Sequence, residues 1–105
     1  MSNTEQMVTK GKELKAMFIQ RLSKMILKKL AMMAEENGTF KFYVSDVELY
    51  YIFEDFDPKK INLAVEYLSE NNYVRLEQTS SSFNICLNTS GYDRATNSQI
   101  SLLYH

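Results

Sequence analysis

Few residues of this chain have the side-chain chemistry that catalysis or metal binding requires. The 105 residues include a single cysteine, Cys86, and a single histidine, His105, at the last position. Nucleophilic catalysis needs a nucleophile beside a base, and a structural zinc site needs a set of cysteine and histidine ligands. The sequence offers neither set, so we expect no catalytic residues and no enzyme activity.

The acidic run of Glu54, Asp55 and Asp57 is the remaining candidate for a metal site. Carboxylates bind cations, but this run lacks the Asp-x-Asp-x-Asp-Gly spacing of a calcium loop. Asp57 also precedes Pro58, and this pair is typical of a helix start, where Asp caps the helix and Pro takes its first position. We therefore expect no metal and no cofactor.

Charge is distributed unevenly along the chain, although the net charge is only -1. Residues 1–30 hold seven basic and two acidic residues, a net charge of +5, and residues 31–105 carry -6. Arg21, Lys24 and Lys28 recur at i, i+3 and i+7, which places them on one side of a helix. They are candidates for contacting nucleic acid or an acidic partner, or they form the solvated side of an amphipathic helix.

Length and composition are typical of one globular domain, with 45% hydrophobic residues to supply a core. The single cysteine leaves no internal disulfide, and the polar N-terminal segment lacks the apolar run of a signal peptide. No stretch approaches the roughly 18 apolar residues that a membrane span needs. We therefore expect a cytoplasmic protein without membrane contact.

Helical periodicity dominates the first third of the chain. Apolar residues recur at spacings of three and four from about Lys12 to Glu36, and Asn37-Gly38 supplies a stop signal. Residues 1–11 show no periodicity, so we expect them to be disordered. The apolar side of the predicted helix consists of Leu14, Phe18, Leu22, Met25, Ile26, Leu30 and Met33.

Two short helices are predicted to follow residues 39–44, which are rich in aromatic residues and could form a short strand. Ser45 and Glu48 fit the capping box S-x-x-E at the start of the first helix. Asp57-Pro58 begins the second helix almost where the first ends. The core-facing side of the second helix consists of Ile61, Ala64, Val65 and Leu68.

Residues 73–79 and 83–87 alternate in hydrophobicity around a polar, serine-rich turn, which predicts a β-hairpin. Cys86 is expected to face across this hairpin as a small apolar side chain. The tail over residues 93–105 contains an apolar patch, and its pattern leaves helix, strand and arm open. The apolar residues of the tail are Ile100, Leu102, Leu103 and Tyr104.

The order helix, short strand, helix, turn, helix and hairpin over about residues 13–92 resembles the winged helix-turn-helix family. The match is carried by the Ser45 cap, the Asp57-Pro58 turn and the segment 68–74, which opens the wing. Residues 87–91 resemble the L-T-x-x-G turn that closes the wing, with Asn88 in place of Thr. The resemblance implies a mainly α fold with a small β-hairpin (α+β), a winged helix-turn-helix with a long N-terminal helix, over residues 12–92.

By this resemblance, the helix from Pro58 to Asn71 would lie in the major groove of double-stranded DNA, with the hairpin on the backbone or minor groove. The chain would be a transcriptional regulator or accessory factor of a prokaryotic genome or mobile element. A homodimer through helix 12–36 and the tail would match two half-sites. The implied DNA-binding residues are Lys59, Lys60, Asn62, Arg75, Ser80, Ser81, Arg21, Lys24 and Lys28.

Three outward residues of the predicted recognition helix are unfavourable for binding DNA. Glu66 and Glu70 would approach phosphates with like charge, and Leu63 is apolar. The family also has members that bind proteins, so the alternative is a protein-interaction module that does not bind DNA.

Overall fold

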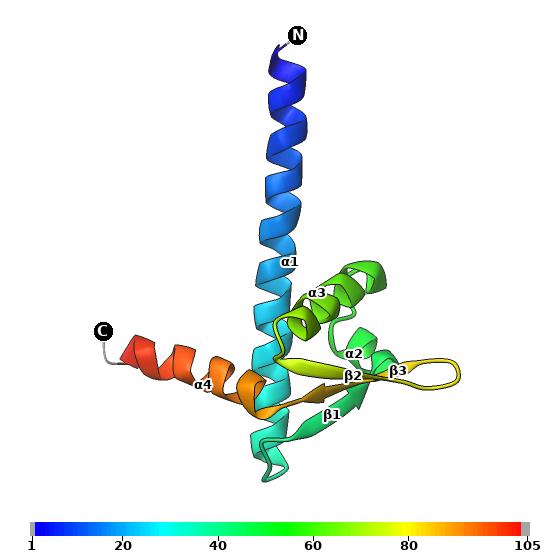
Figure 1. Cartoon of the computed structure of the whole chain (residues 1–105), viewed down its shortest axis with the longest axis vertical. Helices are drawn as coiled ribbons and strands as arrows, with labels where there is room; N and C mark the ends of the chain where they lie inside the picture. Colours follow the sequence, from blue (N-terminus) through cyan, green and yellow to red (C-terminus); the bar gives the residue numbers. More distant parts are fainter. Residues whose placement is uncertain (1, 104–105) are drawn as a thin grey trace.

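The computed structural model describes the backbone of residues 2–103 and the side chains of residues 18–97, and it shows a mixed α+β fold (Figure 1). A body formed by two short helices and a small sheet lies against one side of a long first helix. The last helix extends from the other side of that helix (Figure 1). In order, the elements are α1 (Ser2–Glu36), β1 (Phe42–Ser45), α2 (Asp46–Ile52), α3 (Pro58–Glu70), β2 (Val74–Gln78), β3 (Phe83–Leu87) and α4 (Thr89–Leu103).

The sheet has three antiparallel strands in the order β1-β3-β2. The predicted hairpin is confirmed as β2–β3, and the short segment before α2 joins it as a third strand. Val44 of β1 lies opposite Ile85 of β3, which lies opposite Leu76 of β2. Val44 and Ile85 are buried because this row faces the helices.

α1 begins at Ser2, earlier than the start predicted near Lys12. Residues 2–11 are therefore helical in the structure instead of forming the predicted disordered segment. They contain no proline, and each residue added to an existing helix gains a backbone hydrogen bond. The lack of amphipathic periodicity in residues 2–11 indicated that no side of this segment packs against a core. It did not exclude a helix.

The end of α1 is the predicted one. Gly38 has a φ of +68°, and the amide of Thr39 donates to the carbonyl of Ala34 at 2.9 Å. The amide of Gly38 donates to the carbonyl of Glu35 at 3.0 Å. These two bonds form a Schellman motif, in which a glycine with positive φ satisfies the last carbonyls of a helix.

Both predicted caps are confirmed. The Ser45 hydroxyl accepts from the amide of Glu48 at 3.2 Å and donates to its carboxylate at 3.3 Å. The carboxylate of Asp57 accepts from the amide of Lys59 at 2.9 Å, with Pro58 at the first helical position. The Ser45 cap fixes the start of α2, and the Asp57 cap fixes the start of α3 a few residues after α2 ends.

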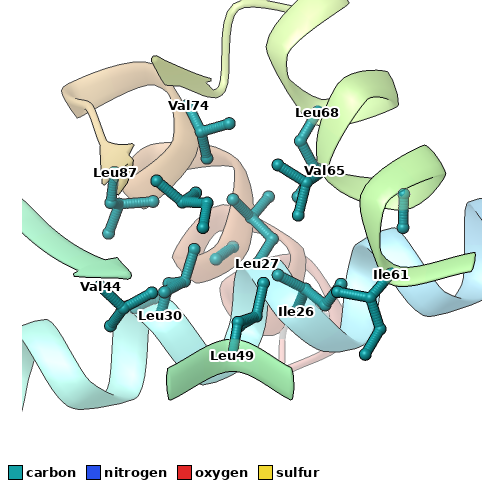
Figure 2. Packing of buried hydrophobic residues seen from close by; sticks show 14 of the residues in the cluster. Ile26, Leu27, Leu30, Val44, Leu49, Ile61, Val65, Leu68, Val74 and Leu87 are labelled. Carbon is teal, nitrogen blue, oxygen red and sulfur yellow. The ribbon is translucent and has the colours of Figure 1, made fainter. Parts of the chain in front are cut away.

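The core lies where α1, α3 and the sheet meet (Figure 2). Met25 was predicted on the buried side of α1 but is 46% exposed, whereas Leu27 is buried. The reason is α4, which packs against α1 and so shifts the buried side of α1 toward Leu27. Leu27 of α1 and Ala95 of α4 both line the groove between the two helices. The buried residues of α1 are Leu22, Ser23, Ile26, Leu27, Leu30, Ala31 and Ala34.

The tail left open by the sequence is a helix, so the expected boundary between residues 92 and 93 falls inside α4. Asn88 caps its start by accepting from the amide of Gly91 at 2.8 Å, and it donates to the carbonyl of Asn72 at 2.8 Å. The Tyr92 hydroxyl donates to the carboxylate of Glu35 at 2.9 Å, which raises the pKa of Tyr92 above its ordinary value. α4 is thus tied both to the turn after α3 and to α1.

Candidate nucleic-acid interface

The predicted contact residues at the start of α3 have different surroundings. Lys59 is exposed, but the Lys60 ammonium lies 4.8 Å from the ring centre of Phe18 on α1. A cation over an aromatic face at this distance is attracted to the ring. Lys60 therefore fastens α3 to α1, a role that its position in the sequence did not indicate.

Asn62 is likewise held from within the protein. Its side-chain oxygen accepts a hydrogen bond from the Tyr50 hydroxyl of α2 at 2.6 Å. This bond fixes the orientation of the amide and leaves the amide NH₂ group as the part that can donate to a ligand.

The residues predicted to form the wing lie on the hairpin β2–β3. The Arg75 guanidinium contacts the carboxylate of Glu77 at 2.6 Å, and both side chains are well exposed. A hydrogen bond with Cys86 and the charge of Glu77 raise the pKa of Arg75, so this side chain stays charged. Ser80 and Ser81 are exposed at the tip. Arg75 therefore offers DNA a cation whose charge is already partly compensated.

The outward side of α3 is acidic and partly apolar, as the sequence predicted. Glu66 and Glu70 are exposed, and Leu63 is 52% exposed. Carboxylates on this side repel a phosphate backbone. The strongest candidate for an anion-binding surface is therefore elsewhere.

A groove of about 570 Å³ lies between α1, the C-terminal end of α3 and the start of α4. It brings together Lys24 and Lys28 of α1 with Arg94 of α4, and the lining residues among the described side chains include no carboxylate. Arg21 is exposed on α1 but does not line this groove. The remaining lining residues are Gln20, Ser23, Met25, Leu27, Tyr67, Leu68, Asn71, Tyr73 and Ala95.

Lys24 and Lys28 are the lining residues that the sequence predicted as binding residues, and Arg94, Tyr67 and Asn71 are among those that it did not predict. Arg94 lies in a segment whose structure the sequence left open, so its position relative to Lys24 and Lys28 had no sequence signal. Tyr67 follows Leu63 by one helical turn on α3, and it is 39% exposed. Its helical spacing from Leu63 and Asn71 was the one available indication.

A second, more apolar groove of about 420 Å³ lies between α1 and α2. Met25 and Met32 contribute from α1 and are 46% and 50% exposed. Ile52 and Phe53 form its other wall, and Lys28 and Lys29 lie at its border. This surface suits an apolar partner better than an anion.

The described side chains include no group of three or more His, Cys, Asp or Glu residues placed to hold a metal ion. Within the part of the chain that the structure describes, no helix has the length and apolar character to cross a membrane. His105 and the apolar patch of residues 100–104 lie outside the described side chains. Comparisons of the chain with protein-family models, with curated proteins and with solved structures gave no match.

Proposed function

We propose that this chain is a small DNA-binding protein, and the basic groove between α1, α3 and α4 is the observation that carries the proposal. DNA binding depends chiefly on neutralising phosphates with Lys and Arg. Lys24, Lys28 and Arg94 gather in one groove, although the whole chain has a net charge of -1. A local positive surface on a near-neutral protein favours an anionic polymer as its ligand.

The fold in this proposal is that of a winged helix-turn-helix protein. The order α1-β1-α2-α3-β2-β3 supports it, as do the short connection between α2 and α3 and the sheet order β1-β3-β2. In this role the protein is a cytoplasmic transcriptional regulator or accessory factor of a prokaryotic genome or mobile element. α3 and the hairpin read the site, and the basic residues of α1 supply attraction to phosphates.

The proposal is tested by fluorescence anisotropy of a labelled DNA duplex titrated with the protein at 50 and 200 mM salt. For roughly four phosphate contacts, the affinity should fall by on the order of 100-fold between the two salt concentrations, because each contact releases counterions. Absence of binding at 50 mM salt would contradict the proposal.

The alternative is a protein-interaction module on the same fold, and the outward side of α3 favours it. Leu63, Glu66 and Glu70 present an apolar and acidic surface that repels DNA but suits a basic protein partner. In this case no duplex binding is expected, and Leu63→Glu should abolish retention of the partner in a pull-down.

We also propose that the protein forms a homodimer through α1, with the tail contributing. Met32 supports this role because it is half exposed in the apolar groove beside Ile52 and Phe53. Exposed apolar surface of this kind commonly marks an interface. The tail's own contribution falls outside the described side chains.

Met32→Glu is expected to shift the mass measured by light scattering from dimer toward monomer, because it places a charge in the proposed contact. Leu63→Glu is the matched control, since Leu63 has similar exposure on α3, and it should leave the mass unchanged. A wild-type protein that is monomeric at high concentration removes the proposal. A mass lowered only by Leu63→Glu would move the interface to α3.

A further inference from the structure

We infer that the groove between α1, α3 and α4 holds the phosphodiester backbone of DNA, so that the main phosphate contacts lie there and not on the outward side of α3. This inference rests on the DNA-binding function proposed above and names the site that carries it. The groove combines cations from two separate helices, Lys24 and Lys28 on one wall and Arg94 on the other.

The neutral residues of the groove have the chemistry that phosphate contacts use. Phosphate and sugar oxygens in DNA complexes are contacted by Arg and Lys and also by the side chains of Ser, Thr, Asn, Gln and Tyr. Gln20, Tyr67, Asn71 and Tyr73 line the groove beside the three cations. Asn71 donates its side-chain NH₂ to the Tyr67 carbonyl at 2.8 Å, which fixes the amide in place.

The spacing of the two lysines suits successive phosphates along one strand. Lys24 and Lys28 are one turn apart on α1, which corresponds to about 6 Å along the helix axis. A strand advances about 3.4 Å of duplex axis per phosphate, so two phosphates are within reach of these flexible side chains. Both lysines are exposed, and their heads can therefore reach a ligand without unfolding any part of the chain.

The opposite wall of the groove is held in position before any ligand arrives. α4 is capped by Asn88 and tied to α1 by the hydrogen bond from Tyr92 to Glu35. Arg94 lies between Tyr92 and the buried Ala95, so the backbone that carries it is fixed. A site whose walls are already ordered loses less entropy on binding.

The outward side of α3 supplies fewer contacts by comparison. Lys60 lies over Phe18, the oxygen of Asn62 is held by Tyr50, and Glu66 and Glu70 are exposed there. The backbone of DNA is therefore expected to pass along α1 and cross the end of α3 toward α4.

The test compares the salt dependence of duplex binding for the wild type and three charge variants. Lys24→Gln with Lys28→Gln should weaken binding at 0.1 M salt by at least about tenfold and reduce the slope of log K against log[salt] by about 2. Arg94→Gln tests the groove itself, because it changes the opposite wall, and it should reduce the slope by about 1. The matched control for Arg94→Gln is Lys41→Gln, which removes one exposed charge outside the groove and should leave the slope near that of the wild type.

The outcomes separate this inference from the function on which it rests. Wild-type binding whose slope is unaffected by the groove variants would overturn the inference and leave DNA binding standing. Absence of wild-type binding would overturn both. If the groove variants lose binding of a poly-glutamate peptide while duplex binding is unchanged, the groove serves an acidic protein partner and the inference is wrong. Far-ultraviolet circular dichroism of each variant verifies that its fold is intact.

Discussion

Gly91→Ala should destabilise the protein by about 3 kcal/mol, near the upper end of the cost of overpacking. A Cβ atom at this position would overlap the backbone carbonyl oxygen of Tyr73 and lie 2.9 Å from Cδ1 of Leu87. The first clash is with backbone, which has no alternative rotamer, so α4 would have to move away from the turn between α3 and β2. Such a movement also strains the hydrogen bond from the Asn88 side chain to the carbonyl of Asn72, which joins the same two segments.

Gly38→Ala is the matched control for this glycine. Gly38 has a φ of +68°, but a Cβ atom at this position would have no neighbour within 4 Å. Only the left-handed backbone therefore disfavours alanine, at about 1 kcal/mol. Urea denaturation of the two variants measures the difference. Equal losses of stability in the two variants would show that α4 does not pack tightly against the turn.

Local sequence signals determine the ends of most elements. The Ser45 and Asp57 caps and the Asn37-Gly38 stop each depend on side chains and backbone within a few residues, and the structure places each as predicted. The alternation of residues 74–78 and 83–87 likewise has the same period in the sequence and in the sheet. These features needed no knowledge of the tertiary structure.

The sequence left the structure of the tail open, and three positions were missed because the tail forms α4. The burial of Leu27 and the exposure of Met25 depend on which side of α1 the last helix covers. The place of Arg94 in the basic groove depends on the same contact. The sequence pattern places Gly91 in a wing-closing turn, whereas the structure uses its missing side chain for close packing against Tyr73. Contacts between distant segments decide all of these positions.

The candidate site was predictable only in part, for the same physical reason. The spacing of Lys24 and Lys28 predicted that they share one side of a helix, and both line the groove. The sequence did not reveal that Lys60 turns toward Phe18 or that Asn62 bonds to Tyr50, because these partners are distant along the chain. Residue type shows which ligands a side chain can bind. The tertiary structure decides whether that side chain already contacts another residue of the protein.

Ile26→Ala should cost about 2–5 kcal/mol, the range measured for removing a large aliphatic side chain from a core. Ile26 is 0% exposed and belongs to the buried cluster that joins α1 to α3 and the sheet (Figure 2). The cavity left by the change cannot be filled easily, since Leu22 and Leu30 on the same helix are themselves buried and packed. Thermal unfolding followed by circular dichroism measures the loss.

Leu63→Ala is the control for Ile26→Ala, because Leu63 is 52% exposed and its truncation should change the stability by less than about 0.5 kcal/mol. A small effect of Ile26→Ala would mean that α1 does not pack on α3 as the structure shows. The groove would then lose its floor, since Lys24 and Lys28 are positioned beside Tyr67 and Asn71 by that same packing. If the large effect is observed, the folded variant should still bind duplex DNA with the wild-type salt slope below its unfolding temperature, because Ile26 lies in the core and does not line the groove.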